Sequence, residues 1–314
     1  MNYLKDYREG EKFVGTYLCK QKQILKTKAG KTYYSLTLQD KTGTADGKIW
    51  ELNNGIANFE PMDYIHCEGM VTSFQGNLQM NISRVRISDE GEYDPADYVP
   101  CTNKDVGEMF SCILKYVASV QNKYLRKILE MYFVENKEFV DAFKKHSAAK
   151  SVHHGFMGGL LEHTLSVTDM CQYFAEHYPM IHRDLLITAA LFHDMGKIQE
   201  ISDFPMNDYT DDGQLLGHIY IGARCMENAA AQIPNFPPKL KNELVHCILA
   251  HHGKMEFGSP KVPAIMEAMA LHMADNADAK LQTLTEVFTQ AGDNMGWLGF
   301  NRMFESNLRK TSEE

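Results

Sequence analysis

The sequence of 314 residues lacks the marks of a secreted or membrane-embedded protein. Its seven cysteines are an odd number and form no CxxC pair, which argues against a disulfide framework and against a thiolate zinc site. The first residues, MNYLKDYREGEKF, lack the apolar core of a signal peptide, and no apolar run approaches the length of a membrane span. We therefore expect a reduced, cytoplasmic protein without a membrane partner.

A surplus of positive charge is also missing. The formal net charge is −9, which argues against a protein that coats nucleic acid through its overall charge. The charges are unevenly distributed, however, because residues 1–50 contain ten Lys or Arg and five Asp or Glu, a balance of +5 that leaves −14 for the remainder. This pattern is typical of a polyanion-binding module attached to a domain that holds cations.

The first 90 residues predict an all-β domain. Five segments rich in β-branched and aromatic residues are separated by turn signals such as KTKAGK and DKTG. Their order, with a short helix at NNGIANF between the third and the fourth, matches an OB-type barrel over residues 1–90; another small β-barrel or sandwich is the alternative. The five segments are FVGTYLC, TYYSLTLQD, TADGKIW, DYIHCEGMVTSF and NLQMNISRVRI.

The rest of the chain predicts an all-α domain. Residues 91–104 lie in an acidic, proline-bearing stretch that is typical of a linker. Residues 105–290 carry apolar side chains at helical spacing. Residues 291–314 form a C-terminal tail of aromatic and charged residues that could cover a neighbouring domain or subunit. The predicted fold class is thus multidomain, and a share of 44% apolar residues is enough for two packed cores.

The stretch LFHDMGK, residues 191–197, places charged side chains in apolar surroundings. Together with the preceding DLLITAA it predicts a helix that is apolar on nearly every side, as buried helices are. An ionised carboxylate buried there costs many kcal/mol unless it is paired, hydrogen-bonded or bound to a metal. Asp194 therefore needs a compensating partner.

Other histidines and acids also lie on faces that should be buried. His163, for instance, shares a helix face with Leu160 and Val167. A single inward histidine is more often a satisfied core residue than a ligand, but a whole set in one helical domain needs a common explanation. Divalent cations would satisfy the set jointly, and Asp194 is placed to bridge two ions with its two oxygens. The set consists of His163, His193, Asp194, His218, His251, His252 and Asp275.

The order of these motifs resembles a known family. His, His-Asp, His, His-His and Asp, with HDMGK at the centre, is similar to the HD superfamily of metal-dependent phosphohydrolases in its dinuclear form. A barrel followed by GGLLEHT, LFHDMGK, ILAHHG and DNADAK resembles, over nearly the whole chain, the YhaM family of 3′ to 5′ exoribonucleases. The resemblance implies one metal held by His163, His193, Asp194 and Asp275, and another held by Asp194, His218, His251 and His252.

The resemblance also implies an activity, namely hydrolysis of single-stranded RNA or DNA from the 3′ end to nucleoside 5′-monophosphates. The polarity depends on the resemblance alone. Two divalent ions are expected as cofactors, and ligands without thiolate suit Mn²⁺ best among Mn²⁺, Co²⁺, Fe²⁺, Ni²⁺ and Zn²⁺. The partner is single-stranded nucleic acid, and a homo-oligomer is left open.

Three residues are candidates for catalysis. Asp194 is the proposed bridging ligand. Lys197, one helical turn beyond His193, could bind a phosphate oxygen as a point charge, or could be a surface lysine at a helix end. His154 could donate a proton to the leaving oxygen or contact substrate, or could be a loop histidine without a role.

The barrel would bind the strand by stacking bases on aromatic side chains and by placing basic groups along the phosphates. Aromatic residues on strands are more often simply core, so the individual residues are hypotheses. The candidates are Tyr33, Tyr34, Lys48, Trp50 and Phe74.

Two other functions remain compatible with the sequence. An HD phosphodiesterase of small or cyclic nucleotides would use the barrel only for regulation. A single-strand binding factor would use the barrel alone and keep the metal site as structure, but an intact ligand set with open coordination positions argues against it.

Overall fold

The computed structural model describes residues 2–74, 77–150 and 154–312. The chain divides into two compact units, residues 1–101 with 204–206, and residues 102–203 with 207–314. The division after residue 101 lies in the segment predicted as a linker. Within the described residues, no helix combines the length and the apolar character that a membrane span requires.

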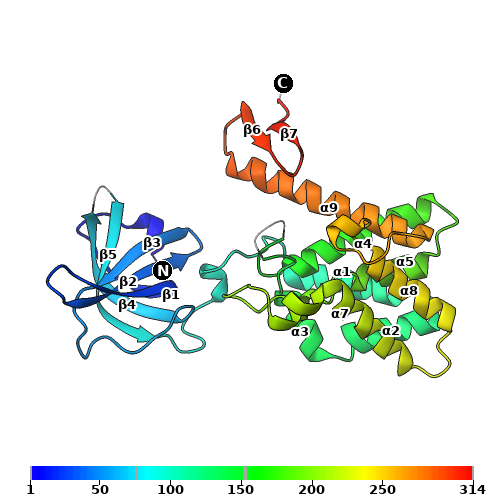
Figure 1. Ribbon diagram of the computed structural model, residues 1–314, viewed down its shortest axis with the longest axis horizontal. Helices are drawn as coiled ribbons and strands as arrows, with labels where there is room; N and C mark the ends of the chain where they lie inside the picture. Colours follow the sequence, from blue (N-terminus) through cyan, green and yellow to red (C-terminus); the bar gives the residue numbers. More distant parts are fainter. Residues whose placement is uncertain (1, 75–76, 151–153, 313–314) are drawn as a thin grey trace. The chain divides into compact units, whose positions relative to one another are not determined.

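The first unit is a closed barrel with strands in the order β1-β2-β3-β5-β4 (Figure 1). All neighbouring strands are antiparallel except β3 and β5, which are parallel, and this is the arrangement of an OB-type barrel. The predicted OB-type barrel is confirmed. The strands are β1 (Lys12–Lys26), β2 (Thr32–Asp40), β3 (Gly43–Ile49), β4 (Tyr64–Phe74) and β5 (Asn77–Ile87), and two short 3₁₀ helices flank them, η1 (Leu4–Asp6) and η2 (Pro95–Asp97).

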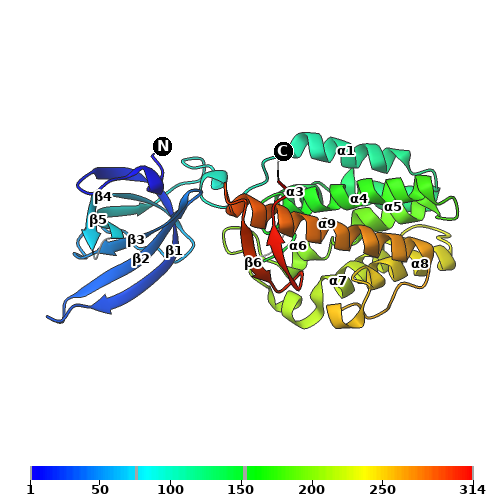
Figure 2. The ribbon, with the colours of Figure 1, turned by 90° about the horizontal axis from the view of Figure 1, so that it is seen from above.

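The long strand β1 closes the barrel because it pairs with two neighbours. Its first half pairs with β4, and its second half pairs with β2 after a register shift between Cys19 and Gln21. Such a bulge bends a strand and increases its twist. The far end of β1 and the start of β2 extend as a hairpin beyond the barrel wall (Figure 2). This extension carries exposed basic side chains, Lys20, Lys26, Lys28 and Lys31.

The short helix predicted at residues 53–59 is wrong. The described chain is irregular there, and its backbone pairs with β5 instead. Val85 N donates to Gly55 O, and Ala57 N donates to Val85 O, both at 2.9 Å. Phe59 is buried in the barrel core. Strand-like pairing of the backbone and the burial of Phe59 therefore satisfy this segment better than a short helix would.

The second unit is helical, as predicted, and its helices surround one apolar core. The central helices α4, α5 and α9 contact one another, and α8 contacts α5 and α9. A C-terminal hairpin follows α9. The helices are α1 (Val106–Ser119), α2 (Lys123–Phe133), α3 (Lys137–Lys145), α4 (Gly159–His177), α5 (Arg183–Phe192), α6 (Lys197–Glu200), α7 (Asp211–Ala231), α8 (Pro238–Ala250), η3 (Met255–Phe257) and α9 (Met266–Gln290), and the hairpin strands are β6 (Trp297–Asn301) and β7 (Ser306–Arg309).

The predicted continuous helix through LFHDMGK is interrupted in the structure. α5 ends at Phe192, a turn contains His193 and Asp194, and α6 begins at Lys197. The turn passes close to another backbone, because a Cβ on Gly196 would lie 2.1 Å from the carbonyl oxygen of His218. Glycine is therefore required at position 196, and the interruption brings α7 against the His-Asp pair.

Candidate metal centre

The side chains predicted as metal ligands converge in the helical unit. They come from α4, the turn after α5, α7, the end of α8 and the following turn, and α9. The innermost four are 0–2% exposed. The convergent residues are His163, His193, Asp194, His218, His251, His252 and Asp275.

The first group surrounds the Nε2 atom of His163. This atom lies 3.1 Å from His193 Nε2, and 3.3 Å from both Asp194 Oδ2 and Asp275 Oδ1. His193 Nε2 lies 3.4 Å from Asp194 Oδ2. Ligand atoms bound about 2.1 Å from one cation lie about 3.0–3.4 Å from one another, so these spacings suit a shared divalent ion.

The second group consists of His218, His251 and His252, whose ligand nitrogens lie within 4.8 Å of one another. The Nε2 atoms of His218 and His251 are each 3.6 Å from Asp194 Oδ1. Within the described part of the chain, these two nitrogens and Asp194 Oδ1 are buried without a hydrogen-bond partner. Buried polar atoms are normally partnered, so this cluster of orphan atoms fits a cation ligand set.

Asp194 lies between the two groups. Its Oδ2 faces His163 and His193, and its Oδ1 faces His218 and His251. A carboxylate with its two oxygens directed at two separate nitrogen clusters has the geometry of a bridging ligand.

The histidines present Nε2 to the centre because the Nδ1 atoms are engaged elsewhere. In three of them Nδ1 bonds a backbone carbonyl at 2.7–2.8 Å. Such a bond fixes the ring orientation and the tautomer, as is usual for metal-binding histidines. The three pairs are His193 with Ala190, His251 with Ile248, and His252 with Phe257.

The other two histidines are held by carboxylates that the sequence analysis missed. His163 Nδ1 lies 2.6 Å from Asp278 Oδ2, and His218 Nδ1 lies 2.9 Å from Glu200 Oε1. Glu200 also accepts from His218 N at 3.0 Å, at the point where Gly217, with φ of 73°, kinks α7. Helical spacing was the available signal, since Asp278 follows Asp275 by three residues.

The electrostatics of the cluster keep three of the ligands, His251, His252 and Asp194, in metal-binding forms. Burial lowers the pKa of His251, and it lowers the pKa of His252 to about 4 with a further contribution from His251. Burial raises the pKa of Asp194, but the Lys197 ammonium and the His193 imidazole outweigh it and hold that pKa well below its ordinary value. Neutral imidazoles and an ionised carboxylate are the protonation states that bind cations. Burial lowers the pKa of His163, but the carboxylates of Asp194, Asp275 and Asp278 outweigh it and raise that pKa.

The helical unit matches the HD domain model over residues 160–280, which contain every proposed ligand. Over 81% of the chain, the sequence is 32% identical to the 3′-5′ exoribonuclease YhaM of Bacillus subtilis, covering 81% of that protein. The chain belongs to the YhaM family. The YhaM of Geobacillus sp. is also 32% identical, over 81% of this chain and 78% of its own length. A solved OB-fold domain of replication protein A from Methanococcus maripaludis matches 30% of the chain and all of its own length, at 19% identity and a TM-score of 0.24.

Lys197 of this YhaM-family chain is directed into the cluster. Its Nζ lies 2.6 Å from Asp194 Oδ2, and its side chain is 13% exposed. The alternative of a surface lysine at a helix end is therefore wrong. That Lys197 binds a phosphate oxygen of the substrate stays a prediction.

His154 lies behind His163, at 2% exposure. Its Nε2 is 2.9 Å from Asp278 Oδ2, and the Ser166 hydroxyl also donates to Asp278. His154 is thus a buried loop histidine in contact with Asp278, and its role toward substrate stays a prediction. A buried imidazole bonded to Asp278 supports the orientation of His163 more directly than it supports proton donation to substrate.

The barrel candidates occupy different surroundings. Tyr33 stacks on Trp50, with ring centroids 4.6 Å apart, and Trp50 is 40% exposed. Phe74 is 61% exposed at the end of β4. Lys48 Nζ bonds Asp46 at 2.6 Å, so this lysine is already paired.

Tyr34 does not fit the predicted stacking role. It packs against the barrel core, edge-on to Phe59, because successive side chains on a strand point to opposite faces. Tyr33, Trp50 and Phe74 therefore stay the candidates for stacking on the barrel surface.

Proposed function

We propose that this chain is a metal-dependent 3′ to 5′ exoribonuclease that hydrolyses single-stranded RNA to nucleoside 5′-monophosphates. The observation that carries the proposal is Asp194, a buried carboxylate with one oxygen directed to each of two imidazole clusters. Membership of the YhaM family supports the substrate and the direction. Single-stranded DNA is a second substrate of the same chemistry.

The residues fit two divalent cations. His163, His193, Asp194 and Asp275 would hold one, and Asp194, His218, His251 and His252 would hold the other. The ligand set contains nitrogen and carboxylate oxygen without thiolate, which favours Mn²⁺ over softer ions. When bound, two such ions supply Lewis acidity and an activated water for phosphodiester hydrolysis.

The protein's own residues orient and confine the reaction. Asp278 and Glu200 hold the rings of His163 and His218, which fixes the direction of their Nε2 atoms. The Lys197 ammonium lies beside Asp194, where it can bind a phosphate oxygen. The buried side chains of His193 and His251 exclude bulk water from the base of the site, which strengthens every charge interaction there.

The direct test of the proposed function is a product ladder. The protein is incubated with Mn²⁺ and a 5′-labelled single-stranded RNA. A ladder that shortens progressively from the 3′ end, together with nucleoside 5′-monophosphates, supports the proposal. Internal cleavage, or turnover only of small or cyclic nucleotides, would refute it.

We expect Asp278→Ala to lower the affinity for Mn²⁺ by about 10–100-fold, because His163 loses the carboxylate that orients its ring. Asp278→Asn should lose less, since an amide oxygen can still accept from His163 Nδ1. Titration calorimetry measures the affinity, with Asp141→Ala on the exposed face of α3 as the control. Unchanged affinity in Asp278→Ala would show that the carboxylate does not position the ligand.

We expect the double variant Tyr33→Ala, Trp50→Ala to weaken binding of a single-stranded RNA by about tenfold or more, because stacking contributes about 1–3 kcal/mol per base. The dependence of log affinity on log salt should stay the same, since no phosphate contact is removed. Fluorescence anisotropy at several salt concentrations measures both quantities. Val14→Ala, an exposed apolar residue of β1, is the control. A changed salt dependence with unchanged affinity would contradict the stacking role.

A further inference from the structure

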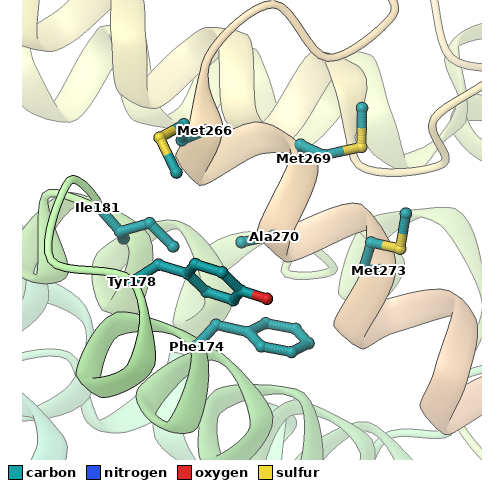
Figure 3. A pocket seen from close by; sticks show the side chains of 7 residues that line it. All are labelled: Phe174, Tyr178, Ile181, Met266, Met269, Ala270 and Met273. Carbon is teal, nitrogen blue, oxygen red and sulfur yellow. The ribbon is translucent and has the colours of Figure 1, made fainter.

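An apolar groove lies on the helical unit between the end of α4 and the start of α9 (Figure 3). None of the proposed metal ligands lines it. Its volume is about 300 Å³. Three methionines of α9 form one side, and Met273 is 54% exposed. The rings of Phe174 and Tyr178 face Ala270 on the other side (Figure 3). The lining residues are Phe174, Tyr178, Ile181, Met266, Met269, Ala270 and Met273.

A second apolar surface lies on the C-terminal hairpin of β6 and β7. Trp297 is 68% exposed and Phe300 is 66% exposed. Neither of the two described cores includes a residue of this hairpin. A two-stranded hairpin is only marginally stable in water by itself, so its aromatic side chains need a surface to cover.

The hairpin and the groove lie at opposite ends of α9. The α9 side of the groove consists of residues 266–273, about the first two turns of the helix. About 25 Å of helix separate Met273 from the C-terminal end at Gln290. Arg309 Nε bonds Met295 O at 3.2 Å, and Lys310 Nζ bonds Gly292 O, so the hairpin is tied to the segment directly after the helix. The hairpin of one chain is thereby held away from the groove of the same chain.

A second copy in antiparallel orientation removes this separation. When two α9 helices lie side by side in opposite directions, the end of each lies beside the start of the other. Leu281, 61% exposed, lies on α9 between the groove and the hairpin and offers an apolar contact at the middle of the paired helices. The two contacts are then identical, as a two-fold axis requires.

We propose that the chain forms a two-fold symmetric dimer in which Trp297 and Phe300 of each copy dock in the methionine-lined groove of the other. Methionine and aromatic side chains are enriched in the cores of protein interfaces, and methionine adapts its shape to an inserted ring. The occupant of the groove is therefore a second copy of this chain.

The test is the mass of the full-length protein in solution, measured by sedimentation equilibrium over a range of concentrations. The wild type is expected to be a dimer. Two double variants are compared with it: the hairpin variant carries Trp297→Ser and Phe300→Ser, and the groove variant carries Met269→Lys and Met273→Lys. Each double variant should raise the dissociation constant of the dimer by about tenfold or more. All four side chains are exposed, so the fold is retained, and Val134→Ser at the end of α2 is the control of similar exposure.

A mixing experiment identifies which surfaces meet. The hairpin variant keeps an intact groove and the groove variant keeps an intact hairpin, so a mixture can form one of the two contacts. We expect heterodimers that are tighter than either variant alone and weaker than the wild type. A monomeric wild type, a dimer of unchanged affinity in both variants, or a mixture without heterodimers would each overturn the proposal.

Discussion

Asp194→Asn is expected to lower the rate of RNA hydrolysis by about a thousandfold or more while the protein stays folded and still binds single strands. Each oxygen of Asp194 faces one imidazole cluster, so an uncharged amide weakens both proposed metal sites at once. Loss of several kcal/mol of charge stabilisation corresponds to a rate change of this size. Single-turnover kinetics measure the rate, and plasma emission spectrometry measures the bound metal.

The matched control for this variant is Asp212→Asn, an exposed carboxylate in the first turn of α7. It should leave rate and metal content unchanged. RNA binding by the separate barrel should persist in both variants. Near-normal turnover by Asp194→Asn with its full metal content would refute the bridging role of this residue.

An RNA hairpin with a 3′ single-stranded overhang should be trimmed to a few nucleotides from the stem and then persist. The side chains of His193 and His251, at the base of the metal centre, are 0% exposed. The side chains around them are only 12–14% exposed; they are Lys197, His218 and Asp275. A single strand can present one phosphodiester to such a site, whereas a paired helix is too wide.

Opening the stem would require about 1–2 kcal/mol per base-pair step, judged from DNA stacking energies. The sequence contains no P-loop motif that would indicate an ATP-driven motor. Stacking on Tyr33 and Trp50 also requires unpaired bases.

Gel electrophoresis of the 5′-labelled hairpin follows the trimming. The control is an RNA of equal length and composition whose sequence cannot pair, which should be degraded completely. If the stem disappears as fast as the overhang, the active site admits a duplex and the model of a narrow opening fails.

The ligand residues could be predicted from the sequence because their number and order carry chemical information. A buried carboxylate at Asp194 is unfavourable without a compensating partner. Inward histidines on successive helices also need partners, and bound cations would satisfy the carboxylate and the histidines together. The barrel was also predictable, since strand periodicity and turn signals are local properties of the chain.

Contacts between distant segments were not predictable in this way. The pairing of Gly55 and Ala57 with Val85 replaces the predicted helix at residues 53–59. The close approach of Gly196 to the backbone of His218 accounts for the interruption after α5. Neither effect is visible in local periodicity, because each depends on a segment more than twenty residues away.

The sequence by itself determined the residue types of the site, the order of the two folds and the unequal charge of the two parts. Only the tertiary structure decided which atoms meet: which oxygen of Asp194 faces which cluster, that Asp278 and Glu200 hold His163 and His218, and that Tyr34 packs inward. The physical reason is that periodicity specifies the face on which a side chain lies, whereas hydrogen bonds and ligand geometry depend on distances between elements that the packing of the whole unit sets.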